Sequence, residues 1–240
     1  MQLEPVQYNV VYHVAMLNHW REIVRGQMGL LAKNRLWKSL TVSVGTADAS
    51  GVNEVIAIIR EVIPSAELQV RQFGLELFEH GAMGLADEVA AEGLPVLYFH
   101  AKGVSYSPVN LYAETWRKYL NRLVEGADDV ARNLVNSGYD AGGQLMVHDP
   151  AHGFTYFAGN FWMAKGEYLR GLQPYAEFAR SPGAGLVPMD RHLAELAVNR
   201  AKRVRGYAID GTLLTPEGVV GYLHRTCVAP LQAAAVKTPR

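Results

Sequence analysis

The sequence predicts an α/β protein with a mostly parallel central sheet flanked by helices. Short β-branched and aromatic runs alternate with amphipathic helical patterns through the first hundred residues. Strands that are separated by helices must pair in parallel through crossover connections. The 240 residues, 49% of them hydrophobic, are enough for one large domain, so a single domain over 1–240 is expected.

Four strands and three helices are predicted in the first hundred residues. The strands are expected at 8–16, 39–46, 66–74 and 95–100. The helices are expected at 18–36, 51–63 and 77–93. Asn18 is the candidate cap of the first helix, Pro64 ends the second, and Gly81 and Gly84 weaken the third.

The second half is predicted to contain longer helices and aromatic strands. A long amphipathic helix is expected over 110–138, with a break near Gly126. A strand over 144–149, an aromatic segment over 152–164 and a helix over 165–172 follow. The remaining expectations are a loop over 180–190, a helix over 191–201 and a disordered end over 236–240.

Composition narrows the functional classes. The 23 basic and 23 acidic residues cancel, which argues against a broad nucleic-acid footprint and leaves a DNA-modifying enzyme as a minor alternative. The single cysteine, Cys227, excludes an internal disulfide and suits a reducing compartment. The chain has neither a signal-peptide pattern nor an apolar run of about 18 residues. A cytoplasmic protein is expected, and the sequence does not indicate its oligomeric state.

The end of the fourth predicted strand carries the most informative residues. His100 and Lys102 lie on either side of one alanine, and Gly103 follows. Ligands of parallel α/β sheets bind beyond the carboxyl ends of the strands, so these residues are expected in a cleft. Lys102 would present a point charge to phosphate, His100 a hydrogen bond, and Gly103 a close backbone approach. The alternative is a surface lysine beside a histidine that is satisfied by the backbone.

Five segments taken together resemble a known group of proteins. In chain order they are NHWREIV, YFHAKG, ETWRKYL, YDAGG and FAGNFWMAKGEYLRGL. The set is similar to a group of bacterial and viral glycosyltransferase-like proteins, with YFHAKG and GNFWMA as the specific parts. The resemblance covers roughly residues 8 to 200 and implies a GT-A-like nucleotide-sugar transferase fold. Residues 1–107 would hold the nucleotide, and 108–240 would complete the donor-phosphate site and bind a carbohydrate or other hydroxyl-bearing acceptor.

The resemblance implies a donor site at the carboxyl ends of three strands. GT-A enzymes commonly hold a divalent metal there with an Asp-x-Asp pair, whereas this chain has His100-Ala101-Lys102. A site that does not require a metal is therefore expected, with Mn²⁺ or Mg²⁺ allowed but not needed. The expected donor-binding residues are Val14, Ala15, Trp20, Arg21, Thr46, His100, Lys102, Gly103 and Arg117.

The long helix leaves two interpretations open. Trp116 is either a core residue or part of the site, and Arg117 is either exposed or a bidentate phosphate ligand.

The acceptor side and the catalytic base are predicted from the rest of the chain. Adjacent Phe161 and Trp162 on a strand face opposite sides, so one ring is expected to be exposed as a sugar platform. Gly159 and Asn160 would allow close approach and hydrogen bonding to hydroxyls. The alternative is a purely structural aromatic hairpin.

An inverting transfer needs a carboxylate base. Glu195 and Asp190 are the candidates, and Asp190 has a helix cap as its alternative role.

Two other functions remain open at the level of sequence. His148, Asp149 and His152 suggest a metallohydrolase, but Pro150 interrupts the regular helical spacing such a site would use. The second alternative is a non-catalytic sugar or nucleotide-sugar binding protein, that is, a degenerate transferase. The missing Asp-x-Asp favours this alternative, and Lys102 and Glu195 argue against it.

Overall fold

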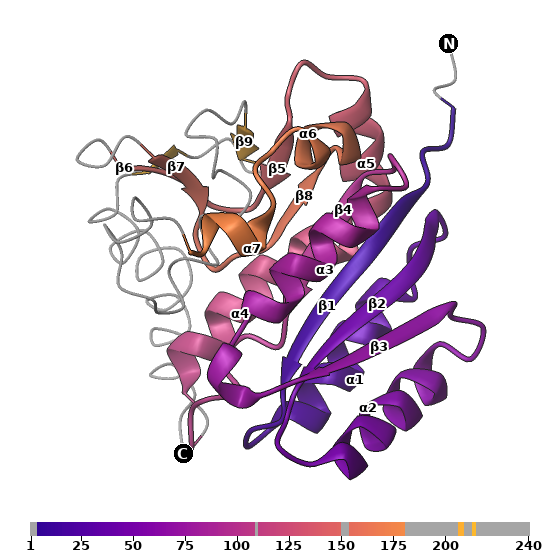
Figure 1. Cartoon of the computed structure of the whole chain (residues 1–240), viewed down its shortest axis with the longest axis vertical. Coiled ribbons are helices and arrows are strands. Elements are labelled where there is room, and N and C mark those ends of the chain that lie inside the picture. The colour runs from indigo at the N-terminus through magenta and orange to yellow at the C-terminus, as the bar shows by residue number, and fades with distance from the viewer. Residues whose placement is uncertain (1–3, 109, 150–153, 181–205, 209–212, 215–240) are drawn as a thin grey trace, which may run out of the picture.

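The computed structural model describes residues 4–108, 110–149, 154–180, 206–208 and 213–214 (Figure 1). Their largest feature is a seven-stranded sheet in the order β3-β2-β1-β4-β8-β5-β9. Strands β3, β2, β1 and β4 are parallel, and β8 runs antiparallel between β4 and β5. A smaller sheet has the order β10-β6-β7. The mostly parallel sheet with flanking helices confirms the predicted fold class.

The first half follows the predicted alternation closely. Its elements are β1 (Tyr8–Ala15), α1 (Trp20–Leu31), β2 (Trp37–Gly45), α2 (Ala49–Val62), β3 (Leu68–Phe73), the short 3₁₀ helix η1 (Leu75–Leu77), α3 (His80–Ala90) and β4 (Val96–His100). The third helix begins three residues later than predicted, because η1 and Phe78 at φ +44° occupy its expected start.

The second half departs more from the predictions. Its elements are α4 (Leu111–Glu125), α5 (Ala127–Val135), β5 (Ala141–Gly143), β6 (Met146–Asp149), β7 (Phe154–Phe157), β8 (Trp162–Ala164), α6 (Gly166–Arg170), α7 (Tyr175–Phe178), β9 (Gly206–Ala208) and β10 (Leu213–Leu214). The break at Gly126 is confirmed. The predicted aromatic hairpin is wrong in one respect, because β7 pairs with β6 while β8 enters the central sheet. The expectations for 191–201 and 236–240, and for 181–190 of the predicted loop, lie outside the described residues.

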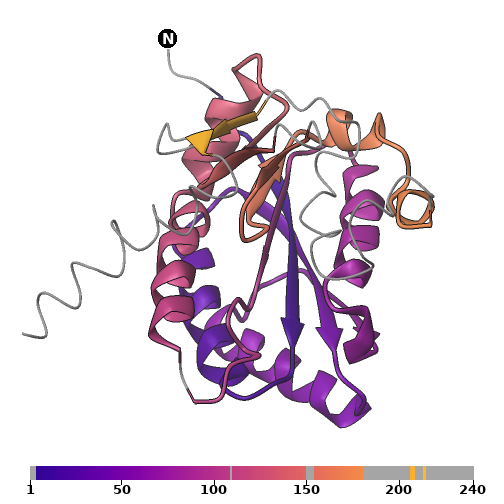
Figure 2. The ribbon, with the colours of Figure 1, turned by 90° about the vertical axis from the view of Figure 1, so that its left-hand side faces the viewer.

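Two helix layers cover the two faces of the sheet (Figure 2). One buried cluster joins α1, α2, α4 and α5 to Tyr12 of β1 and Phe99 of β4, and the other joins α3, α6 and α7 to Val11 and Tyr98. Neighbouring residues of each strand thus face opposite layers, as the strand period of two requires. Every residue of β4 is buried, and its neighbours are β1 and β8. The carboxyl end of β4 therefore emerges from the middle of the molecule.

Within the described part of the chain, no helix is both long enough and apolar enough to cross a membrane.

Candidate functional site

The carboxyl end of β4 is fixed to helix α1 and to the loop before it. The amide of Gln27 donates to the carbonyl oxygen of His100 at 3.0 Å, and its own oxygen accepts from Tyr12 at 2.9 Å. Asn18, at φ +48°, donates to the carbonyl oxygen of Val104 at 2.8 Å. The predicted capping role of Asn18 is therefore wrong, because His19 is the N-cap residue of α1. Asn18 instead links the segment after β1 to the segment after β4.

Helix α4 fixes the next residue of this end. The guanidinium of Arg117 donates to the carbonyl oxygen of Lys102 at 2.8 Å. The ammonium nitrogen of Lys102 lies 4.6 Å from the ring centre of Trp116, a cation–π contact. Gly103 adopts φ +92°, and an added Cβ would lie 3.0 Å from Arg117. Trp116 is partly buried and packs against the core, which is the structural one of its two predicted interpretations.

His100 and Lys102 point to different sides of the sheet. The amide of Lys102 donates to the carbonyl oxygen of His100 at 2.7 Å, so the chain turns as soon as β4 ends. His100 stays on the α3 side, where its Nδ1 lies 3.3 Å from Oε2 of Glu79. Lys102 turns toward α4 and is partly exposed. The two side chains therefore lie on different sides of the sheet, whereas the sequence analysis expected both in one cleft.

Two cations at this edge lack a neutralising carboxylate. Among the described residues, no carboxylate lies within 4.0 Å of the Lys102 ammonium or the Arg117 guanidinium, whereas neighbouring Lys118 pairs with Glu114 at 2.8 Å. Partial burial lowers the pKa of Arg117, and Glu114 opposes this effect. Arginine remains charged at neutral pH. A half-buried positive charge without a partner favours binding of an anion.

On the α3 side, buried polar groups gather around Glu79. The hydroxyl of Tyr98 donates to Oε2 of Glu79 at 3.0 Å, and the amide of Asn160 donates to the same oxygen at 2.6 Å. Burial, followed by the charge of Glu79, raises the pKa of Tyr98 well above its ordinary value, so this hydroxyl stays protonated and donates. Sequence reasoning missed Glu79, because a carboxylate in the first turn of the helix predicted over 77–93 has the ordinary appearance of a solvated residue.

His13 of β1 is held neutral beneath the same edge. It pairs in register with His100, and its Nδ1 lies 3.0 Å from the hydroxyl of Ser43. Burial lowers the pKa of His13 to about 4; the charge of Glu79 opposes this shift and that of His100 adds to it. Imidazole at neutral pH therefore carries no charge at this position.

The other predicted donor-binding residues have structural roles. Val14 and Trp20 are buried in the core. Ala15 is partly buried. Arg21 is on the outer surface and forms a bidentate ion pair with Glu54, with hydrogen bonds of 2.5 and 2.8 Å. Thr46 is buried, and its hydroxyl accepts from the amide of Asp48, which caps α2. Of the predicted donor-binding residues, the structure brings together Lys102, Gly103 and Arg117, with His100 directed away.

The predicted exposed ring of the acceptor site is wrong. Phe161 and Trp162 do face opposite layers, but both are at most 1% exposed. The amide of Asn160 is also used internally, because its Oδ1 accepts from Trp162 at 2.8 Å while its nitrogen binds Glu79. A Cβ at Gly159 would meet Leu120 at 2.6 Å, so the close approach there is that of helix α4.

The remaining candidates are placed only in part. Glu195, Asp190 and His152 lie outside the described residues. His148 is exposed and contacts Thr155 at 3.1 Å. Across the part of the chain that the structure describes, no group of three or more His, Cys, Asp or Glu side chains is arranged to hold a metal ion.

A divalent metal also fits poorly at the end of β4. The ammonium of Lys102, two residues beyond this strand, repels a divalent cation. The described residues of this edge thus do not make a metal site.

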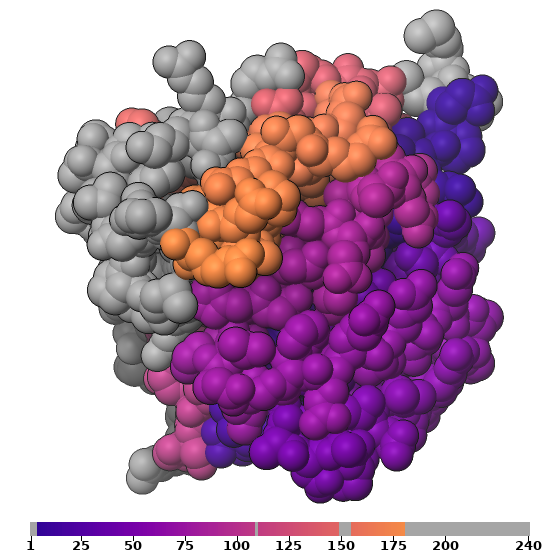
Figure 3. All heavy atoms as spheres, viewed as in Figure 1, coloured from indigo at the N-terminus to yellow at the C-terminus, as the bar shows by residue number. Residues whose placement is uncertain are grey.

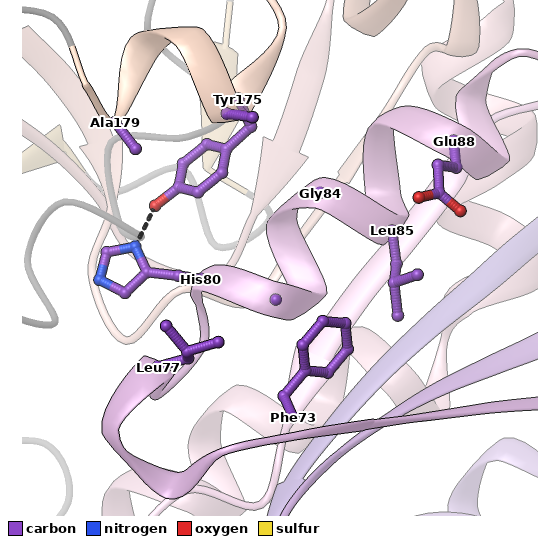
Figure 4. Close-up of a pocket in the computed structure, with 10 residues that line it drawn as sticks. Phe73, Leu77, His80, Gly84, Leu85, Glu88, Tyr175 and Ala179 are labelled. Carbon is purple, nitrogen blue, oxygen red and sulfur yellow. Dashed lines mark hydrogen bonds between the residues drawn. The ribbon is translucent and has the colours of Figure 1, made fainter.

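An apolar pocket lies beside this edge, on the outside of α3. It has a volume of about 280 Å³ and lies between α3 and α7 (Figure 4). In the space-filling view the orange segment that includes α7 lies directly against the purple segment that includes α3 (Figure 3). Phe73 and Tyr175 line opposite sides of it, and Nδ1 of His80 lies 2.6 Å from the Tyr175 hydroxyl. This contact links α3, which begins directly after Glu79, to α7.

Replacing Gly159 with alanine should destabilise the protein. At φ +82°, with Leu120 2.6 Å from the new Cβ, the variant should lose about 1–3 kcal/mol of unfolding free energy in urea titrations. Gly26 is the matched control, because it lies inside α1 with nothing within 4 Å of an added Cβ. Gly26→Ala should gain about 0.5–1 kcal/mol. Equal effects at the two sites would contradict the close packing at Gly159.

His13 should make the fold sensitive to mild acid. Because the pKa of His13 is about 4 when folded and about 6.5 when unfolded, the unfolded chain takes up the proton first as the pH falls. Stability is thus complete above pH 6.5 and is lost toward pH 4, by about 2 kcal/mol at pH 5. Urea titrations at pH 7.5 and 5 should show a smaller loss for His13→Gln. The exposed His148→Gln control should behave like the unmodified protein, and a His13→Gln variant that does so as well would contradict the assignment.

Comparison of the sequence with family models and with curated proteins finds no match. Solved structures do resemble the fold. A mannosyltransferase from Pyrobaculum calidifontis, in complex with GDP-mannose and Mn²⁺, has a TM-score of 0.51 at 12% identity, over 100% of this chain and 68% of that chain.

Two further structures have lower scores. Glucosyl-3-phosphoglycerate synthase from Mycobacterium tuberculosis, with Mn²⁺, UDP-glucose and phosphoglyceric acid, has a TM-score of 0.39 at 12% identity, over 95% of this chain and 79% of that chain. A 4-diphosphocytidyl-2C-methyl-D-erythritol synthase from Anaerococcus prevotii has a TM-score of 0.40 at 9% identity, over 91% and 95%. The first of these likenesses shows that this chain, with its mostly parallel α/β sheet, shares the fold of that mannosyltransferase.

Proposed function

We propose that this protein is a glycosyltransferase that moves a sugar from a nucleotide-sugar donor to a hydroxyl-bearing acceptor. One observation carries the proposal: Lys102 and Arg117 present two cations without a carboxylate partner at the carboxyl end of a central strand. Ligands of such sheets bind at this edge. A diphosphate is the part of a nucleotide sugar that needs this charge.

The two cations suit different parts of the reaction. As the bond between sugar and phosphate breaks, negative charge accumulates on the departing diphosphate. Lys102 would stabilise that charge as a point ammonium, and the planar guanidinium of Arg117 would fix the orientation of the phosphate oxygens. Because Gly103 has no side chain, the backbone beside Lys102 can lie close to Arg117.

An inverting transfer needs a general base that takes the proton from the acceptor hydroxyl. We assign this step to Glu195, with Asp190 as the second candidate; both lie outside the described residues. A retaining reaction would not use the same base.

The mannosyltransferase with the similar fold was solved with GDP-mannose and Mn²⁺. We extend only its class of donor to this chain. In this chain the ammonium of Lys102 would supply positive charge to the donor diphosphate. A non-catalytic nucleotide-sugar binding protein would share this donor site but release no sugar, so donor hydrolysis with candidate acceptors separates the two functions.

Lys102→Ala should weaken donor binding. One charge-assisted contact contributes about 1.5–3 kcal/mol, so the dissociation constant should rise roughly ten- to a hundredfold. Calorimetry with GDP-mannose and UDP-glucose measures this, after a wider panel has identified the tightest nucleotide sugar. The control is Lys118→Ala, which removes an exposed ammonium from α4 next to Arg117 and should leave donor affinity unchanged.

The melting temperature of Lys102→Ala, measured beside its donor affinity, distinguishes a donor-binding lysine from an ordinary residue at a strand end. The melting temperature of Lys102→Ala should stay close to that of the unmodified protein, because a partly exposed lysine supports little core. Unchanged affinity for every nucleotide sugar in the panel would place the donor site elsewhere.

Donor binding should survive removal of divalent metal. Because Lys102 occupies the strand end and the described residues hold no cluster of metal-binding side chains, a chelator should leave the donor dissociation constant unchanged. Calorimetry before and after treatment with EDTA makes the comparison. Loss of binding on chelation, restored by added Mn²⁺, would show that a metal is required.

A further inference from the structure

Glu79 holds together three segments that are far apart in the sequence. It lies between η1 and α3, yet its Oε2 accepts from Tyr98 of β4 at 3.0 Å and from Asn160, before β8, at 2.6 Å. The same oxygen lies 3.3 Å from Nδ1 of His100. Its side chain is 16% exposed. A carboxylate in this setting contributes little to solubility and much to the placement of its neighbours.

One route leads from Glu79 to Lys102 along the backbone. Tyr98 and His100 are the third-last and last residues of β4, and both face Glu79. Lys102 follows His100 by two residues, across the turn closed by its own amide. The contacts of Glu79 thus hold the strand from which Lys102 leaves the sheet.

A second route leads to the Lys102 ammonium from the opposite direction. Asn160, held by Glu79, adopts the uncommon φ of +53°, and Gly159 beside it has φ +82°. This turn packs against Trp116, which would lie 3.3 Å from a Cβ at Gly159. The ring of Trp116 in turn lies 4.6 Å from the Lys102 ammonium. Both ends of the Lys102 side chain are therefore supported by groups that Glu79 orders.

We propose that Glu79 is a positioning residue for donor binding, which acts through Lys102. The inference rests on the proposed function, because it assumes that Lys102 binds the donor diphosphate. Glu79 does not neutralise Lys102, since no carboxylate of the described residues lies within 4.0 Å of that ammonium. It sets where the ammonium lies by holding the end of β4 on one side and the 159–160 turn on the other.

A double-mutant cycle tests this role. Glu79→Gln keeps the shape of the side chain and removes its charge, so the tie to Asn160 and Tyr98 is weakened. Nucleotide-sugar affinity should fall about tenfold, which corresponds to about 1.4 kcal/mol. In the Lys102→Ala background the same substitution should have no further effect, because the ammonium to be positioned is gone. The probes are GDP-mannose and UDP-glucose, measured by calorimetry on the full chain.

The matched control is Glu76→Gln, which removes an exposed carboxylate from the same connection and should change nothing. Tyr98→Phe removes a single hydrogen bond to Glu79 and replaces Glu79→Gln in the cycle if that variant does not fold. It should lower affinity about threefold, again only when Lys102 is present.

The outcomes separate this inference from the proposed function. An equal loss of affinity with and without Lys102 would reveal a general structural role and overturn the inference, as would an unchanged affinity in Glu79→Gln while Lys102→Ala is impaired. If Lys102→Ala itself binds as tightly as the unmodified protein, the proposed donor site fails and the inference fails with it.

Discussion

The arrangement of the candidate site depends on backbone carbonyls at the end of β4 that are hydrogen-bonded by side chains from two helices. Gln27 of α1 binds the carbonyl of His100, and Arg117 of α4 binds that of Lys102. His100 is the last residue of β4, and its carbonyl also accepts from the amide of Lys102. Buried backbone carbonyls without a donor are costly, so these side-chain donors stabilise the turn. Because both helices belong to the same layer, the strand end turns toward that layer and carries Lys102 with it.

Much of the fold follows from local pattern. The four parallel strands and their helices were predictable because each strand has strong β-propensity and the helices between them are amphipathic. Strand β5 was not, since Ala141–Gly143 has no hydrophobic pattern and becomes a strand only by pairing with β8 and β9. The inward placement of Glu79 was missed because its partners Tyr98 and Asn160 lie about twenty and eighty residues away in the sequence.

In the candidate site, too, local pattern predicts approximate positions but not which side chains come into contact. The sequence could predict that Lys102, Gly103 and Arg117 lie near one another, because a strand end and a helix pattern give their approximate positions. The spacing of two between His100 and Lys102 suggested that they act together, and the immediate turn after β4 separates them. Asn160 and Trp162 suggested a sugar platform, but polar and aromatic groups form buried networks equally well when each donor finds an acceptor. Residue type alone does not distinguish a binding surface from a satisfied interior.

The contact between Lys102 and Trp116 bears on whether the ammonium is available to a ligand. A partly exposed cation–π contact contributes about 0.5–1 kcal/mol, whereas a hydrogen bond between an ammonium and a phosphate contributes about 1.5–3 kcal/mol. The indole is therefore a support that a diphosphate can outcompete or share, unlike a carboxylate, which would neutralise the charge. Trp116 also limits the conformations of a long side chain, and this reduces the entropy lost when a ligand binds. A lysine that contacts an aromatic ring is thus more available to an anionic ligand than a lysine paired with a carboxylate, as Lys118 is with Glu114 on α4.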